Sequence, residues 1–168
     1  AAYSSPDGVT EAGAAYLYRL EANGSATFLM KVSAPDKAQH DVFGHSISQS
    51  GNILAVGAHA SDPDGMSNAG AVYLYQLEAN GSASFLSKVT APDKASMDFF
   101  GESVSQSGDV LVVGAVGAVY FYRLEANGSV TYLTKVPAPD EASVGFFGKS
   151  VSQFGNILAV GANLSDPN

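Results

Sequence analysis

A single segment recurs along this chain, and the repetition constrains its fold more than any other feature of the sequence. The pair Phe43-Gly44 returns as Phe100-Gly101 and as Phe147-Gly148, after 57 and then 47 residues. Nearly all other residues belong to whole or partial copies of the segment 43–98. Self-similarity at such a period predicts a repeat architecture, in which each unit packs against its neighbours.

Each unit holds four short segments with strand-like patterns. In the second unit these are His45–Gln49, Ile53–Gly57, Ala71–Glu78 and Ser84–Thr90. The segment Ile53–Gly57 is apolar almost throughout, as expected of a strand that is covered on both faces. Four antiparallel strands per unit at this period predict an all-β chain made of β-propeller blades.

The repeat also predicts how the chain divides. Residues 1–14 align with 58–71, and residues 163–168 align with 59–64, so both ends of the sequence fall in the same loop of the repeat. We expect one repeat region, 1–168, that contains two complete blades and two half-blades. Its units are 1–42 (partial), 43–99, 100–146 and 147–168 (partial).

The third and fourth segments of each unit are joined by Asn-Gly, at Asn23, Asn80 and Asn127. This dipeptide predicts a hairpin with a two-residue turn, which would fix the register of the two strands. In the second unit the predicted pairs are Tyr73 with Lys88, Tyr75 with Leu86 and Gln76 with Phe85; in the other copies they include Arg19 with Phe28 and Arg123 with Tyr132.

Three short motifs resemble a known family. Phe43-Gly44, the VGA of Val56–Ala58 and the GAVYLY of Gly70–Tyr75 are similar to the FG-GAP repeats of integrin α-subunit propellers and their microbial relatives. The similarity covers the whole chain, three times. It implies a β-propeller fold. Integrin-type blades often carry a DxDxDG calcium loop before the VGA strand, but here that position reads SQSGN, at Ser48–Asn52, which has too few carboxylates.

The loop 61–68, SDPDGMSN, is the candidate metal site. Asp62, Asp64 and Asn68 offer the oxygen ligands that calcium prefers. A Pro-Asp-Gly turn explains the same residues without a metal. In the third unit Gly114 is followed almost directly by Gly117, so ten loop residues are absent there. The loop is therefore dispensable for folding, and such loops often carry function.

Each Asn-Gly pair is followed by serine, which completes an N-glycosylation acceptor pattern at Asn23, Asn80 and Asn127. The turn by itself accounts for the asparagine and the glycine but not for the serine. A hairpin tip is also exposed, as an acceptor site must be. These three asparagines are the candidate glycosylation sites.

Composition excludes several classes of function. A formal charge of −8, from 16 acidic and 8 basic residues, argues against a nucleic-acid partner and against an anionic membrane surface. The chain has no cysteine, which rules out disulfides, zinc-thiolate sites and thiol catalysis. No apolar run approaches the length of a membrane span, so we expect no membrane insertion.

Catalytic signals are weak. His40, His45 and His59 do not recur between units and fit no metal-binding or nucleophile motif. Glu102 and Lys149 stand at the positions equivalent to His45 in the later units. We interpret this change of residue as the variation expected of an exposed surface position. The carboxylates that follow the fourth strands, at Asp36, Asp41, Asp93 and Asp98, are interpreted as solvated turn acids.

We therefore expect a non-enzymatic structural or adhesive module, extracellular or on the cell surface. Its N-terminal half-blade would supply strands three and four, and its C-terminal half-blade strands one and two. Head-to-tail contact with further copies would then give a ring or a filament. The alternative is a propeller module that binds calcium or carbohydrate through the Asp-Pro-Asp-Gly loops. A carbohydrate or a surface protein is a further expected partner.

Overall fold

The computed structural model describes residues 8–125, 128–140 and 145–164, and this part of the chain folds into short antiparallel β-sheets. Two of the sheets are four-stranded meanders, which are the two complete blades that the repeat predicts. The first consists of β3 (Ser46–Ser50), β4 (Ile53–Ala58), β5 (Ala71–Leu77) and β6 (Ala83–Val89); the second consists of β7 (Ser103–Ser107), β8 (Val110–Ala115), β9 (Ala118–Leu124) and β10 (Val130–Pro137).

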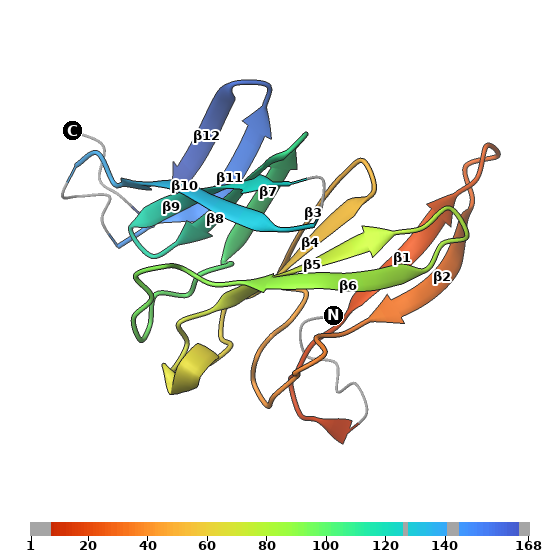
Figure 1. Ribbon diagram of the computed structural model, residues 1–168, viewed down its shortest axis with the longest axis horizontal. Helices are drawn as coiled ribbons and strands as arrows, with labels where there is room; N and C mark the ends of the chain where they lie inside the picture. The colour runs from red at the N-terminus through yellow and green to blue at the C-terminus, as the bar shows by residue number, and fades with distance from the viewer. Residues whose placement is uncertain (1–7, 126–127, 141–144, 165–168) are drawn as a thin grey trace.

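The two half-blades flank the complete ones. One is the hairpin of β1 (Ala15–Leu20) and β2 (Ala26–Val32), and the other is the hairpin of β11 (Phe147–Phe154) and β12 (Ile157–Ala162). Figure 1 shows them on opposite sides of the molecule, and their described strands do not pair with each other. The chain is therefore an open arc of blades and not a closed ring of three.

The hydrophobic core lies between the blades. One cluster joins the first half-blade to the first complete blade, and it contains Val32, Phe43, Val56 and Tyr73. A second cluster joins the two complete blades around Phe100. A sheet that is packed on both faces has no solvent-facing side, which explains why the sequence of its central strands is apolar almost throughout.

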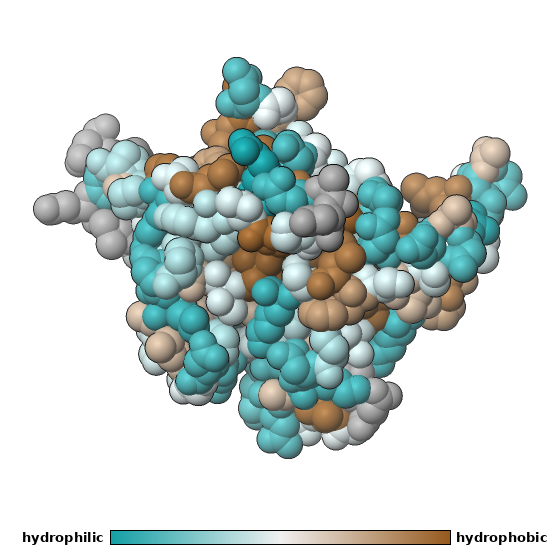
Figure 2. Space-filling view, in the orientation of Figure 1, coloured by the Kyte–Doolittle hydropathy of each residue, from teal (hydrophilic) through white to brown (hydrophobic). Residues whose placement is uncertain are grey.

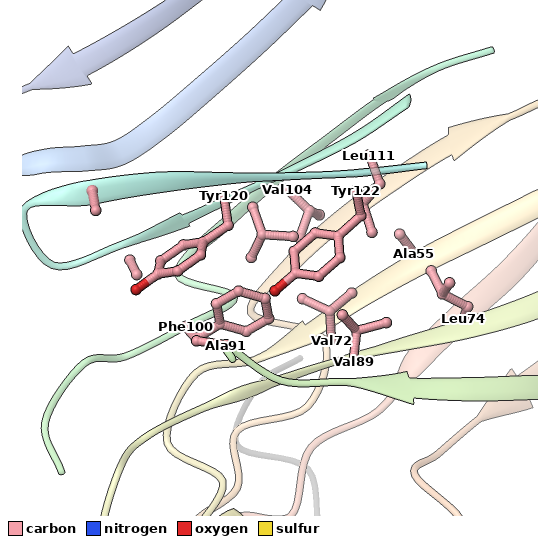
Figure 3. Close-up of a cluster of buried hydrophobic side chains, with 13 residues drawn as sticks. Ala55, Val72, Leu74, Val89, Ala91, Phe100, Val104, Leu111, Tyr120 and Tyr122 are labelled. Carbon is pink, nitrogen blue, oxygen red and sulfur yellow. The ribbon is translucent and has the colours of Figure 1, made fainter. Parts of the chain in front are cut away.

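The phenylalanines of the first two Phe-Gly pairs, Phe43 and Phe100, each anchor one such cluster. Figure 3 shows Phe100 beneath Tyr120 and Tyr122, with Val72 and Val89 of the preceding blade beside it. The rings of Phe100 and Tyr120 meet edge to face, with centroids 5.4 Å apart. Edge-to-face contacts of this kind stabilise aromatic pairs beyond the burial of their area.

The glycines of the repeat allow two backbones to approach closely. Phe100 N donates a hydrogen bond of 3.0 Å to Ala69 O, and Gly70, with φ of +83°, lies next to it. A Cβ at Gly70 would lie 2.1 Å from Phe100 O. The Gly-Ala-Val motif that opens β5 therefore needs its glycine both for its backbone conformation and for contact with the next Phe-Gly pair.

The hairpin loop between β5 and β6 differs from the predicted two-residue turn. Glu78 N donates to Ser82 O, and Gly81 N donates to Glu78 O, so residues 78–82 form the loop. Within it Gly81 has a positive φ of 89°, whereas Asn80 does not. A two-residue type I′ turn needs positive φ at both central positions. The prediction of a two-residue loop at Asn80-Gly81 was therefore wrong.

The longer loop is accompanied by a β-bulge, which changes the predicted register. Tyr73 pairs with Lys88, as predicted. Beyond the bulge Tyr75 pairs with Phe85 and not with Leu86, because the bulge adds a residue to β6. For the same reason three other predicted pairs are wrong: Gln76 pairs with Ser84, Arg19 with Thr27 and Arg123 with Thr131.

Candidate functional site

The predicted metal loop connects β4 to β5 and contains the 3-10 turn η2 (Pro63–Gly65). Asp62 Oδ1 accepts a hydrogen bond of 2.7 Å from Asn68 N, which closes the loop. Asp64 lies 3.0 Å from Lys94 Nζ and points to solvent. Asn68 Nδ2 donates to Ser67 Oγ and Met97 Sδ. Each of these side chains therefore has a partner within the protein.

The position of the integrin-type calcium loop does not fit calcium in this chain. Ser48 Oγ accepts a hydrogen bond of 2.9 Å from Gln106 N, and Ser50 Oγ accepts one of 3.2 Å from Gly108 N. These hydroxyls therefore connect one blade to the backbone of the next. Calcium needs six to eight oxygens and usually several carboxylates, and the turn Ser48–Asn52 supplies no carboxylate.

The hairpin tips give a structural role to the serine of each sequon. Asn23 Oδ1 accepts hydrogen bonds from Ser25 N and Ser25 Oγ, at 2.9 and 2.7 Å. Asn80 Oδ1 and Ser82 make the same two bonds. The turn therefore does account for the serine, which the sequence interpretation missed. Both bonds use Oδ1 and not Nδ2, the atom to which a glycan attaches. The third candidate, Asn127, lies outside the described residues.

Two of the acids that follow the fourth strands connect neighbouring blades. Asp36 Oδ2 lies 2.8 Å from Lys88 Nζ, and Asp93 Oδ2 lies 2.7 Å from Lys135 Nζ. The hydrogen bond from Lys135 lowers the pKa of Asp93, although burial opposes the shift. Tyr120 also donates to Asp93, at 2.9 Å. We call each such Asp–Lys pair a blade seam. Asp36 and Asp93 are exposed turn acids, as interpreted, and each also pairs with a lysine of the next blade.

The other two acids cap their own loops. Asp41 Oδ2 accepts from Ala38 N at 2.7 Å, and Asp98 Oδ2 accepts from Ala95 N at 2.6 Å. Asp41 is 3% exposed, and burial raises its pKa, so the interpretation of Asp41 as a solvated acid was wrong. Neither Asp36 with Asp41 nor Asp93 with Asp98 belongs to a group of three or more potential metal ligands among the described residues.

The structure brings together two histidines that the sequence does not connect. His45 precedes β3 and His59 follows β4, and their ring centroids are 4.0 Å apart. Glu102, from the next blade, places Oε1 3.9 Å from His45 Nε2. Burial lowers the pKa of His59, and the charges of His45 and Lys149 act in the same direction. The interpretation of His45 and Glu102 as mere surface variation missed this cluster.

A cleft of about 560 Å³ opens between the complete blades at their hairpin end. Asn52, Gln76, Asp109 and Glu125 contribute polar groups to its lining, and Leu74, Leu86 and Leu124 contribute apolar ones. The loop 61–68 connects the opposite ends of β4 and β5, so this cleft does not include the predicted metal loop. Among the described residues there is also no helix of the length and apolarity that crossing a membrane requires.

The free edges of the two half-blades expose large apolar side chains. Leu20 on the first is 82% exposed; Phe154 and Ile157 on the last are 88% and 69% exposed. Figure 2 shows hydrophobic surface over both hairpins, at the right and at the top of the molecule. Exposed apolar strands at a sheet edge are templates for pairing with another strand.

Comparison with known proteins bears out the resemblance. A solved structure of a protein from Lactobacillus plantarum aligns with a TM-score of 0.52 at 20% identity, over 77% of this chain and 37% of that one. Likeness at this identity supports the β-propeller-type fold alone. No curated protein matches the chain. A model of the FG-GAP repeat family matches residues 27–75 and 84–132, more than half of the sequence. The chain therefore belongs to the FG-GAP repeat family.

Proposed function

We propose that this chain is a non-enzymatic structural or adhesive module whose half-blades are completed, head to tail, by further copies of itself. The observation that carries the proposal is the different burial of one repeated sequence. ILAVGA forms both β4 and β12, but β4 is almost fully buried, whereas β12 has no fully buried residue. In a complete blade the third strand covers the open edge of the second.

The two half-blades have complementary strands. The last one has first and second strands, β11 and β12, and the first one has third and fourth strands, β1 and β2. In the first complete blade Ile53 of β4 pairs with Gln76 of β5. The repeat places Ile157 and Arg19 at the equivalent positions. A blade completed between two copies would therefore set Ile157 opposite Arg19.

Such contact is heterologous, because one copy contributes its last half-blade and the other its first. It gives a ring if the rotation between copies closes and a filament if it does not. Backbone pairing along a free edge is a common way for strands to recruit a partner. The apolar residues at these edges, among them Leu20 and Ile157, would also be buried by it.

Cysteine cross-linking tests this contact, since the chain has no cysteine of its own. We expect the double variant Arg19→Cys, Ile157→Cys to form intermolecular disulfides under mild oxidation and to give a ladder on a non-reducing gel. The matched control is Gln76→Cys with Ile157→Cys, because Gln76 already pairs with Ile53 inside a complete blade. A ladder of equal intensity in the control would overturn the proposed register.

Light scattering tests the assembly itself. The chain has a mass of 17.2 kDa, and we expect a particle mass above that value which rises with concentration. The variant Ile157→Asp should lower this mass, because it places a charge on the pairing edge. A folded wild-type monomer at micromolar concentration would refute assembly between separate copies.

The extracellular or cell-surface location is part of the same proposal. It is supported by the exposed sequons at the hairpin tips, where Asn23 and Asn80 present their acceptor pattern. If the protein is made in a glycosylating host and exported, its native mass should exceed that of the bare polypeptide, because Asn23, Asn80 or Asn127 carries a glycan. A native mass equal to the polypeptide mass would contradict glycosylation there.

A further inference from the structure

Packing of one blade on the next assembles a cluster of metal-ligating side chains. His45 directly precedes β3, His59 directly follows β4 and Glu102 directly precedes β7. Each offers one ligand atom, and the three atoms lie within 4.8 Å of one another. No motif in the sequence marks this set, because its members come from two different blades.

We propose that His45, His59 and Glu102 form a binding site for a divalent transition-metal ion, with zinc as the best fit, that joins the two complete blades. Two imidazoles and one carboxylate are a common zinc ligand set, and they leave a fourth position for water. Imidazole nitrogen favours zinc and its neighbours in the first transition row over calcium or magnesium. The site is therefore different in chemistry from the oxygen-rich loop at Asp62.

The geometry needs modest closure to hold an ion. Zinc lies about 2.0–2.2 Å from nitrogen and oxygen ligands, which places tetrahedral ligand atoms about 3.3–3.5 Å apart. His45 Nε2 and Glu102 Oε1 are already 3.9 Å apart. The side chain of His45 is 37% exposed, so it has room to rotate toward the other two ligands.

His59 supplies an independent observation. Its Nδ1 is buried and has no hydrogen-bond partner among the described residues. Buried polar atoms are nearly always partnered, and an unpartnered one requires an explanation. The ring of His59 is held between His45 and Phe99, with centroid distances of 4.0 and 5.8 Å. A ligand fixed in place by packing loses little conformational freedom when it binds a metal.

Lys149 is the competing cation. Its Nζ lies 3.3 Å from Glu102 Oε1, and it comes from β11, at the position equivalent to His45 and Glu102. Its ammonium group partly neutralises Glu102, and a metal ion would have to displace it or share the carboxylate. Removing this charge should therefore strengthen metal binding.

Calorimetric titration of the chelator-treated chain with zinc tests the site. We expect one equivalent to bind, and the melting temperature to rise with zinc, because the two blades present the ligands together only in the folded chain. Titration with Co²⁺ should give the visible absorption of a low-coordinate cobalt site. The proposal would be overturned if the chain failed to bind one equivalent of zinc, or if it failed to bind one equivalent of Co²⁺.

Matched variants identify the ligands. His45→Gln and Glu102→Gln should each weaken zinc binding by at least about 100-fold, since loss of even an outer-shell partner costs 10–100-fold. His40→Gln is the control: His40 Nδ1 also lies near a carboxylate, 2.7 Å from Glu11 Oε2, but it has no third ligand among the described residues. Loss of binding in the control, or unchanged binding in the first two, would overturn the assignment.

The variant Lys149→Gln supplies the sharpest test of Glu102. It should bind zinc several-fold more tightly than the wild type, because the competing ammonium is gone while a polar side chain remains. Unchanged or weaker binding would overturn the assignment of Glu102 as a ligand. Circular dichroism on each variant establishes that the fold is intact before its affinity is compared.

Discussion

The strands β4 and β12 have the same sequence, ILAVGA, in different surroundings. Five of the six residues of β4 are buried, and none of those of β12 is. β4 lies between β3 and β5 in its own sheet and packs against neighbouring blades, whereas β12 pairs with β11 alone among the described strands. The burial of an apolar strand thus depends on the strands and blades that lie beside it. The apolar sequence pattern alone does not show whether these neighbours are present.

The largest expected effect comes from replacing the equivalent leucine in each strand with alanine. Leu54→Ala in β4, where the side chain is 2% exposed, should lower the free energy of unfolding by about 2–5 kcal/mol. Leu158→Ala, its counterpart in β12, should cost less than Leu54→Ala in the dissociated chain, because Leu158 is only partly buried there. Urea unfolding at low concentration measures both.

Equal losses in the two variants would mean that β12 is covered in solution. If copies assemble as proposed, the cost of Leu158→Ala should grow with protein concentration, and that of Leu54→Ala should not. The concentration series therefore separates burial within the chain from burial between copies.

The glycine of the same hexapeptide gives a second matched pair. A Cβ at Gly57 would lie 2.2 Å from Gly101 O, in the backbone of the next blade, whereas at Gly161 the nearest described atom outside its chain neighbours is the side-chain Ser150 Oγ. We expect Gly57→Ala to cost about 3 kcal/mol, at the upper end of over-packing, and Gly161→Ala about 1 kcal/mol. Thermal melting compares them, and a larger shift for Gly161→Ala would contradict the assigned contact.

The blade seams test whether the contact between blades depends on charge. Because Lys135 holds the pKa of Asp93 below its unfolded value of about 3.9, ionised Asp93 stabilises the fold above that pH and loses its effect as the pH falls through the folded pKa. Asp93 is 52% exposed in its side chain, so the contribution should be below about 1 kcal/mol.

Urea midpoints of the wild type and Asp93→Asn should therefore differ at pH 6 and converge toward pH 3. The double variant Asp93→Asn, Lys135→Gln is the control, and it should be no less stable than Asp93→Asn alone. A difference that persists or widens on acidification would contradict the assigned interaction between Asp93 and Lys135.

The smallest effect is expected in the loop that one blade has and the next lacks. β8 and β9 are joined by Val116 and Gly117 alone, whereas residues 59–70 join β4 to β5. Replacing Asp62 and Asp64 with alanine should leave the β-sheet circular dichroism spectrum intact and cost about 0.5 kcal/mol, because the main loss is the exposed hydrogen bond from Asn68 N to Asp62. Loss of the β-sheet signal would show that the loop is required for folding.

Much of the fold could be predicted because the signals are local and repeated. The Phe-Gly pairs, the apolar second strands and the hairpins at Asn-Gly gave the order and bounds of the strands to within a few residues. The loop length was predicted wrongly at Asn80, because Asn-Gly is compatible with more than one turn. The β-bulge in β6 then shifted the register of every pair beyond it.

The sequence by itself determined the repeat, the four-stranded blade and the order of its strands, since these depend on side-chain periodicity and on residues close together in the chain. Only the tertiary structure decided what meets between blades. Asp93 meets Lys135, and His45 and His59 meet Glu102, although these residues lie far apart in the sequence. Such contacts depend on how far one twisted sheet rotates against the next, which no local pattern encodes.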